Sequence, residues 1–193
     1  KKMFTPATQG ITYAQLIHHA AAIDIKRANN QTKDGLGISQ AAFVGFKGDE
    51  LIISVTASQK SAHQHHRVKI KLCEWEQAQD DLGEDDKRKA KKVIKNLCAG
   101  RVQVDCDCGR WQYWYRYIAT VGSFALKPYE HAFPKIRNPH LDGVACKHII
   151  HALTRLQSGV WQARVASNLE KSVNQVAFGS DKKNITKFFT EKD

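Results

Sequence analysis

The pattern of hydrophobic and polar positions predicts three β-strands in the N-terminal half of the chain. Residues 43–46 and 51–55 are rich in β-branched and aromatic side chains, and the turn-forming sequence Lys47-Gly48-Asp49 lies between them, so we expect a β-hairpin. In "RVKIKLCEW" (67–75) apolar residues alternate with two lysines and Cys73. A period of two residues is typical of a strand with one buried face, and we expect this strand to be half buried.

Four other stretches have a period near 3.6 residues, which predicts α-helices. The first begins at Thr12, a residue that can cap a helix, and stops at Asn29-Asn30. The others cover 85–100, 144–159 and 160–179, and Gly100 ends the first of these three. In chain order, the residues expected on the buried faces are Leu16, Ile17, Ala20, Ala21 and Ile23; Ala90, Val93, Ile94 and Leu97; Ile149, Ile150, Leu153 and Leu156; and Trp161, Val165, Leu169, Val173 and Val176.

The stretch "RWQYWYRYIATVG" (110–122) is unusually rich in aromatic rings, and we interpret it as a strand. One face would then carry Trp111, Tyr113, Tyr115 and Tyr117. The rings form either a platform for stacking nucleic-acid bases or a wall of the core, and the core is the favoured interpretation. Trp114 and Arg116 are the pair expected to face outward. A long loop, 126–143, follows the stretch and contains three prolines.

The charge of the chain points to a polyanionic partner. There are 30 Lys and Arg residues against 19 Asp and Glu, which gives a formal net charge of +11, and this balance favours nucleic acid or acidic protein as a partner. The exposed face of helix 85–100 is either an ordinary solvated surface or one that contacts phosphates. No apolar run is long enough to cross a bilayer, so we expect no membrane partner. The residues predicted to contact nucleic acid or an acidic partner are Lys87, Arg88, Lys91, Lys92, Lys95, Arg110, Trp114 and Arg116.

Two tight pairs of metal-ligand residues stand far apart in the sequence. The first is Cys106 and Cys108 in "VDCDCGRW", and the second is Cys146 and His148 in "VACKHIIHAL". Three thiolates and one imidazole are a ligand set that zinc takes in structural sites, so we predict a closed Cys3His zinc site. A Cys-His catalytic dyad, a disulfide within the first pair and ordinary core cysteines are weaker alternatives. Cys73 is interpreted as a bystander, and the histidines of "QKSAHQHH" (59–66) as a solvated loop.

The pattern Cys-x-Cys followed by Cys-x-His resembles the SWIM zinc-finger family. The matching residues are Cys106 and Cys108 in "CDC" and Cys146 and His148 in "CKH", and the likeness covers about residues 101–157. The resemblance implies a structural zinc ion and binding to DNA or to proteins. The spacer between the pairs is longer than is usual in the family. With its phrase "NPHLDGVACKH", it is more loosely similar to SWIM-like segments of bacteriophage proteins, including virion components.

Together these observations predict an α+β protein. We expect an N-terminal helix and antiparallel strands in a region 1–100 that ends with the basic helix, a ββα zinc module over 101–158, and a C-terminal helix with a basic tail over 159–193. The leading function is a non-enzymatic part of a nucleoprotein assembly such as a phage virion, at a capsid, neck or tail interface, with no small-molecule substrate. Alternatives are a free DNA-binding regulator or accessory protein, and a redox-responsive protein. The odd cysteine count and the absence of a signal-like start favour the host cytoplasm or a virion over secretion.

Overall fold

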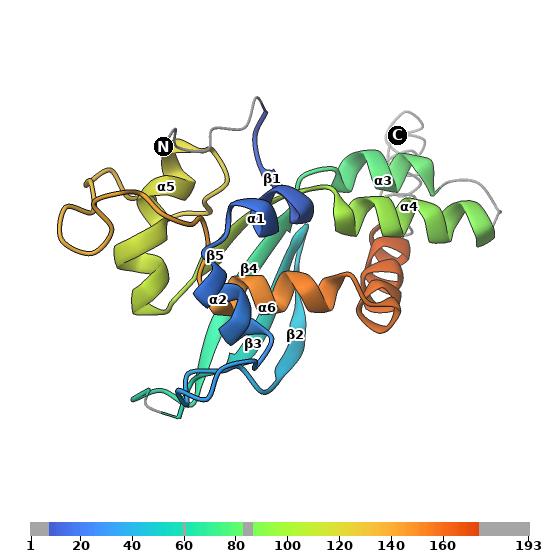
Figure 1. Ribbon diagram of the computed structural model, residues 1–193. Helices are drawn as coiled ribbons and strands as arrows, with labels where there is room; N and C mark the ends of the chain where they lie inside the picture. Colours follow the sequence, from blue (N-terminus) through green and yellow to red (C-terminus); the bar gives the residue numbers. More distant parts are fainter. Residues whose placement is uncertain (1–7, 60, 83–86, 174–193) are drawn as a thin grey trace, which may run out of the picture.

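The computed structural model describes residues 8–59, 61–82 and 87–173. Within these ranges the chain forms one antiparallel five-stranded sheet with helices around it, which confirms the α+β class (Figure 1). The spatial order of the strands is β1-β5-β4-β3-β2. Their bounds are Ile11–Thr12 for β1, Ala41–Lys47 for β2, Glu50–Thr56 for β3, His65–Leu72 for β4 and Arg101–Cys106 for β5.

Two helices precede β2, two lie between β4 and β5, and the other labelled helical segments follow β5. In chain order, the labelled segments are α1 (Tyr13–His19), α2 (Ala22–Ala28), α3 (Trp75–Asp81), α4 (Lys87–Ala99), the π-helical turn η1 (Trp111–Tyr115), α5 (Arg116–Val121) and α6 (Lys147–Leu156). A further helix covers 159–173. Of the 160–179 helix predicted from the sequence, residues 174–179 lie outside the described residues, as does the basic tail.

The β2–β3 hairpin and strand β4 are confirmed where the sequence predicts them. Gly48 forms the hairpin turn with a φ of +63°, a conformation that a residue without a Cβ adopts at little cost. In β4 the alternating residues Val68, Ile70 and Leu72 are fully buried, as expected. The alternation in β3 is equally clear, so one face of the sheet is apolar and needs a cover.

Helix α6 supplies most of that cover. It lies across the sheet and contacts β2, β3, β4 and β5, as well as α1 and α2 (Figure 1). Its predicted buried residues are all buried, and so are Lys147, His148, His151 and Ala152, because neighbouring elements enclose α6 on nearly all sides. The sheet and α6 therefore enclose the main core, and β5 and the start of α6 both border it.

The aromatic stretch is helical, so the prediction of a strand there, and with it the second strand of a ββα module, is wrong. It forms η1 and α5, and Trp111, Tyr115, Ile118 and Ala119 are buried. These residues follow the helical spacing i, i+4, i+7 and i+8, whereas Tyr113 lies on the other face with 57% of its surface exposed. Aromatic residues have a high propensity for strands, but here the burial of one helical face outweighs that propensity.

The N-terminal helix is broken in two. Thr12 caps α1 as predicted, with a capping box to Gln15, and Asn29 ends α2. Between them Ala20 and Ala21 are extended, which the single predicted helix did not include. After the break, α2 packs against α6.

The basic helix is confirmed as α4, with Ile94 and Leu97 buried and Gly100 after its end. It packs beside α3, a short helix that the sequence analysis missed. Strand β5 pairs with β4 from the N-terminal half, so residues 101–106 belong to the same sheet as that half. Across the described ranges, no helix is both long and apolar enough to cross a membrane.

Candidate metal centre

The four predicted ligand residues lie together in the core. Cys106, Cys108, Cys146 and His148 each present one ligand atom, and these atoms all lie within 4.8 Å of one another. None of the four residues is more than 4% exposed. In a tetrahedral site with zinc–sulfur distances of about 2.3 Å, two sulfurs are about 3.8 Å apart. The four side chains therefore form a site that could hold one metal ion.

The first pair is placed by the end of β5 and the start of η1. Cys106 is the last residue of the strand and points into the core on the same face as Val104. The chain then turns, and the backbone N–H of Trp111 donates to Cys108 Sγ at 3.3 Å, while the N–H of Gln112 donates to the Cys108 carbonyl at 3.1 Å. Because Cys108 thus begins the helical segment, its sulfur is brought back toward that of Cys106.

The second pair is placed by the N-terminus of α6. Cys146 is the N-cap residue with extended backbone, and His148 lies in the first turn. Gly143 leads into this end with a φ of +77°, and a Cβ there would lie 3.0 Å from the Tyr115 ring and 3.2 Å from Ala21. Only glycine permits this close approach, which brings the long loop back to the core just before the ligands.

Burial and hydrogen bonding set the protonation of the sulfurs. Burial raises the pKa of the Cys106 and Cys146 thiols well above the usual range. Hydrogen bonds from Cys106 and then from Cys146 lower the pKa of Cys108. In the absence of a cation, burial therefore disfavours the thiolate form at Cys106 and Cys146, and hydrogen bonding favours it at Cys108. A divalent ion would displace the remaining protons and compensate the buried negative charges.

The imidazole of His148 also fits a ligand role. Its Nδ1 lies 4.0 Å from Cys106 Sγ, and its Nε2 is buried without a hydrogen-bond partner among the described residues. A buried polar atom with no partner is uncommon, and metal coordination satisfies one ring nitrogen. Four protein ligands close a tetrahedral coordination sphere, which is the arrangement of structural rather than catalytic zinc.

A histidine that the sequence analysis assigned to a solvated loop lies against the cluster. His66 is in β4, only 9% exposed, and its ring centroid is 4.5 Å from that of His148. Its Nδ1 is 2.9 Å from Asp107 Oδ1, and both oxygens of Asp107 accept from the backbone N–H of Arg67 at 3.1 Å. The interpretation of His65 and His66 as loop residues is therefore wrong. His66 thus packs against the ring of one of the four predicted ligand residues and is itself held by Asp107.

Asp105 and Asp107 alternate with the cysteines in "DCDC". This alternation is a sequence signal from which the two carboxylates beside the cluster could have been predicted. In a strand, Asp105 points away from the face that carries Cys106. Its Oδ1 accepts hydrogen bonds from Trp111 Nε1 at 2.9 Å and from Arg116 Nη2 at 2.8 Å. The side chain of Arg116 is only 11% exposed, so it lies in an internal ion pair rather than facing outward as expected.

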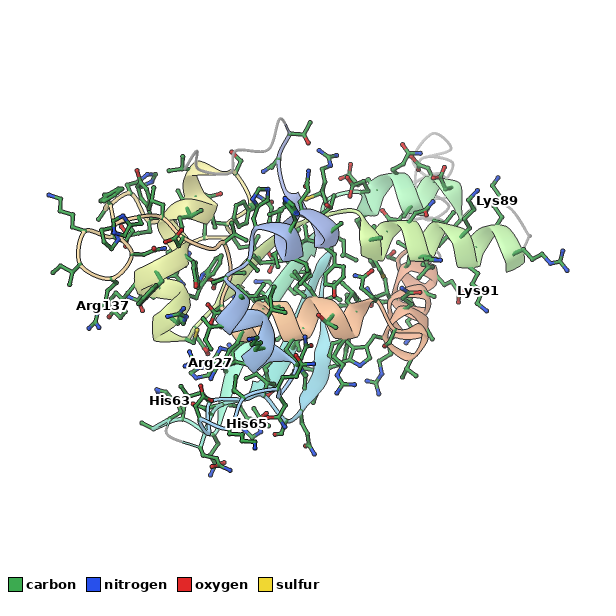
Figure 2. The ribbon with its side chains drawn as sticks, viewed as in Figure 1. Arg27, His63, His65, Lys89, Lys91 and Arg137 are labelled. Carbon is green, nitrogen blue, oxygen red and sulfur yellow. The ribbon has the colours of Figure 1, made fainter. Side chains whose placement is uncertain are left out.

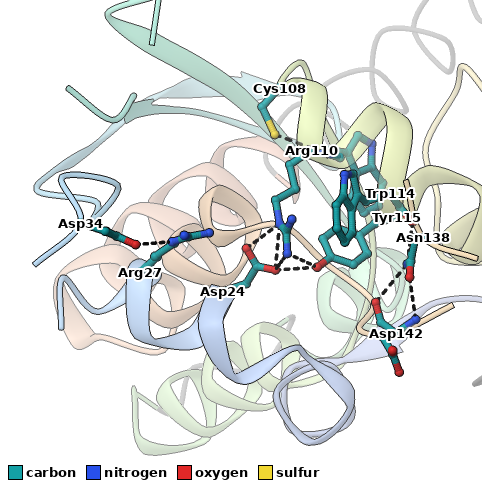
Figure 3. A network of polar contacts seen from close by, with 10 residues as sticks. Asp24, Arg27, Asp34, Cys108, Arg110, Trp114, Tyr115, Asn138 and Asp142 are labelled. Atoms are coloured by element: carbon teal, nitrogen blue, oxygen red, sulfur yellow. Dashed lines mark hydrogen bonds and ion pairs between the residues drawn. The ribbon is translucent and has the colours of Figure 1, made fainter. Parts of the chain in front are cut away.

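Another internal network anchors η1 to α2 (Figure 3). The fully buried carboxylate of Asp24 accepts from Arg110 Nε and Nη2, both at 2.9 Å, and from the Tyr115 hydroxyl at 2.5 Å. The Arg110 guanidinium also lies 4.1 Å from the centre of the Trp114 ring. Sequence reasoning placed Arg110 and Trp114 at a partner surface, whereas the structure places them in contact with one another beside this network.

The remaining predicted contact residues lie on α4. Arg88, Lys91, Lys92 and Lys95 are exposed, and the side chain of Lys91 extends away from the helix (Figure 2). The side chain of Lys87 lies outside the described part of the structure. The exposed face of α4 and the Cys3His cluster are separate features of the molecule.

Comparison of the chain with protein-family models, with curated proteins and with solved structures finds no match.

Proposed function

We propose that the chain is a non-enzymatic binding protein whose C-terminal half is stabilised by a structural zinc ion. The observation that carries the proposal is the buried Cys3His cluster, in which four ligand atoms from two distant segments lie within 4.8 Å of one another. Zinc suits this set better than magnesium or calcium, because those ions prefer oxygen ligands. The ion would supply cohesion between β5, η1 and α6.

In this proposal the protein works within a nucleoprotein assembly such as a phage virion, at a capsid, neck or tail interface. The order of the two ligand pairs and the helix after His148 support a likeness to SWIM zinc fingers. The net charge of +11 and the exposed lysines of α4 support a basic surface that faces nucleic acid or an acidic protein. The exposed lysines of α4, rather than its buried Ile94 and Leu97, would contact phosphates or carboxylates.

The metal is tested by elemental analysis and thermal melting of the purified protein. We expect one zinc ion per chain, and we expect Cys108→Ser and Cys146→Ser to lose it and to unfold the C-terminal half. Cys73→Ser is the matched control, because Cys73 is half-buried and lies outside the cluster. Zinc binding is worth about 10–16 kcal/mol in small zinc modules, as much as the whole stability of a typical domain. Wild-type melting in both cluster variants would contradict the proposal.

The basic surface is tested by fluorescence anisotropy with a labelled DNA duplex over a range of salt concentrations. Affinity should fall steeply with salt, since phosphate contacts release counterions. Lys91→Glu with Lys95→Glu should weaken binding and leave melting unchanged, whereas Lys47→Glu with Lys69→Glu serves as a control of equal charge on the sheet. If the two double variants weaken DNA binding equally, only the net charge matters, and the α4 lysines do not form a specific DNA contact. Recovery of the protein from its source as a free chain, outside any large particle, would argue against an assembly component.

A further inference from the structure

A groove of about 270 Å³ lies between the η1–α5 segment and the long loop that follows it. The groove lies on the outer face of η1. Tyr113 lines it, whereas Trp111 and Tyr115, on the opposite face of η1, are buried in the core. The side chains that give the groove its character are Tyr113, Tyr117, Phe133, Pro134, Ile136 and Arg137.

Aromatic rings are exposed along this groove. Tyr113 is 57% exposed and Phe133 is 42% exposed, and the rings of Tyr117 and Phe133 meet edge to face with centroids 5.6 Å apart. Exposed apolar groups gathered at one place commonly mark a binding site. Here the exposed groups include flat rings, which offer faces on which a planar ligand can stack.

The loop side of the groove is held in a defined shape. The Asn138 side chain donates to the carbonyls of Trp114 and Asp142, at 3.1 and 3.0 Å, and accepts from the Asp142 N–H at 2.9 Å (Figure 3). At the other end, the N–H of Glu130 donates to the Thr120 hydroxyl at 3.0 Å. Since Asn138 is buried, these bonds fix the loop against the helix and preorganise the rings.

The charge of the groove is basic. Lys135 and Arg137 are exposed at its rim, and Arg137 lies at the outer edge of the molecule (Figure 2). Lys127, exposed, comes from the same loop. Among the described residues that line the groove, Glu130 is the only carboxylate, and its Oε1 already accepts from the Ala132 N–H at 2.8 Å. Two cations, Lys135 and Arg137, against this one carboxylate leave the lining of the groove with a net positive charge that favours an anionic ligand.

We propose that this groove binds single-stranded nucleic acid, with bases stacked on Tyr113 and Phe133 and phosphates held by Lys135 and Arg137. Rings combined with a basic rim are the features by which proteins hold single strands without reading sequence. In a duplex the base faces are covered by their neighbours, so the groove would favour unpaired strands. The inference depends on the proposed function, in which basic surfaces of the protein bind nucleic acid. It specifies single-stranded nucleic acid as the ligand and the groove beside η1 and α5 as its binding site.

The experiment measures binding of zinc-loaded full-length protein to a fluorescein-labelled 15-nucleotide oligothymidylate by anisotropy. We expect Tyr113→Ala and Phe133→Ala each to weaken binding about 5- to 150-fold, the range for loss of one stacked base. Tyr113→Phe should restore near wild-type affinity because the ring remains. Val44→Ala is the control, since Val44 is 63% exposed on β2, away from the groove. Zinc content should not change in either variant, and melting should change little in Tyr113→Ala and modestly in Phe133→Ala, which loses the ring contact with Tyr117.

The possible outcomes separate this inference from the proposed function. If oligothymidylate binding is insensitive to both ring variants, while the α4 double variant weakens duplex binding, the groove is not a single-strand site and the proposed function stands. Weakening of duplex and oligothymidylate by equal factors in the ring variants would also overturn the inference, because stacking needs unpaired bases. If the wild-type protein binds neither probe at low salt, the nucleic-acid part of the proposed function fails together with the inference.

Discussion

Substitution of Arg110 by alanine should destabilise the protein strongly, although the residue is partly exposed. The Asp24 carboxylate is 0% exposed and accepts four hydrogen bonds, three from Arg110 and one from Tyr115. In Arg110→Ala only the tyrosine donor remains, and a buried carboxylate loses its counter-charge. Burial and the nearby Asp24 raise the pKa of Tyr115, so this hydroxyl stays protonated and cannot replace the positive charge.

The expected loss follows from the contacts. Breaking a buried ion pair by removing one partner costs about 3–5 kcal/mol. Because the Arg110 side chain retains 27% exposure, water can reach part of the site, and we expect a loss near the lower end, about 3 kcal/mol. Tyr115→Phe removes two hydrogen bonds with charged groups, one donated to Asp24 and one accepted from Arg110, and should cost at least about 1.5–3 kcal/mol. Asp24→Ala combined with Arg110→Ala should be less destabilising than the sum of the single changes, since no unpaired charge is left.

The assay is urea denaturation of the zinc-loaded variants, followed by circular dichroism. Arg137→Ala is the matched control because Arg137 is an exposed arginine, and its effect should stay within about 0.5 kcal/mol. A loss below about 1 kcal/mol in Arg110→Ala would refute the reasoning. It would mean that the Asp24 charge is compensated by solvent, and Arg110 would return as a candidate contact for a partner.

Two further predictions concern the metal cluster and the loop before β2. His66→Ala should weaken zinc affinity about 10- to 100-fold in competition with a chelator, because the ring packs on His148 and is tied to Asp107; unchanged affinity would make His66 a bystander. Hydrogen bonds from Thr32, the Leu36 N–H and Arg27 lower the pKa of Asp34 to about 2, so its contribution to stability should be complete above about pH 4 and lost as the pH falls toward 2. The stability difference between wild type and Asp34→Asn should therefore be constant from pH 7 to 5 and shrink below pH 4; a difference that grows on acidification would contradict this sign.

Features set by local periodicity could be predicted from the sequence. The alternation in β4 and the stripe on α6 each repeat over at least two periods, so each stretch has one apolar face and one place to bury it. The ligand pairs could also be predicted, because Cys and His at a spacing of two are rare without a metal. The position of Cys146 at the helix N-cap followed from the apolar stripe that begins after it.

The aromatic stretch shows why other features could not be predicted. Its rings favour a strand by propensity, and alternate residues are aromatic, yet the buried residues follow a helical period. The deciding contacts are tertiary: Trp111 Nε1 donates to Asp105, and the Tyr115 hydroxyl donates to Asp24, 91 residues away. The break between α1 and α2 has a similar origin, since Gly143 approaches Ala21 from 122 positions along the chain.

The same contacts connect the metal cluster to the groove. Cys108 accepts the Trp111 N–H and so fixes the start of η1, the turn that carries Tyr113 on its outer face. Trp111 and Tyr115 hold the inner face through Asp105 and Asp24, and the Trp114 carbonyl accepts from Asn138, which shapes the loop. Residues 108–114 therefore contain the Cys108 sulfur, the exposed ring of Tyr113 and the Trp114 carbonyl that holds the loop on the other side of the groove. A structural ion at the cluster would thus stabilise the binding surface as well as the core, without touching what binds there.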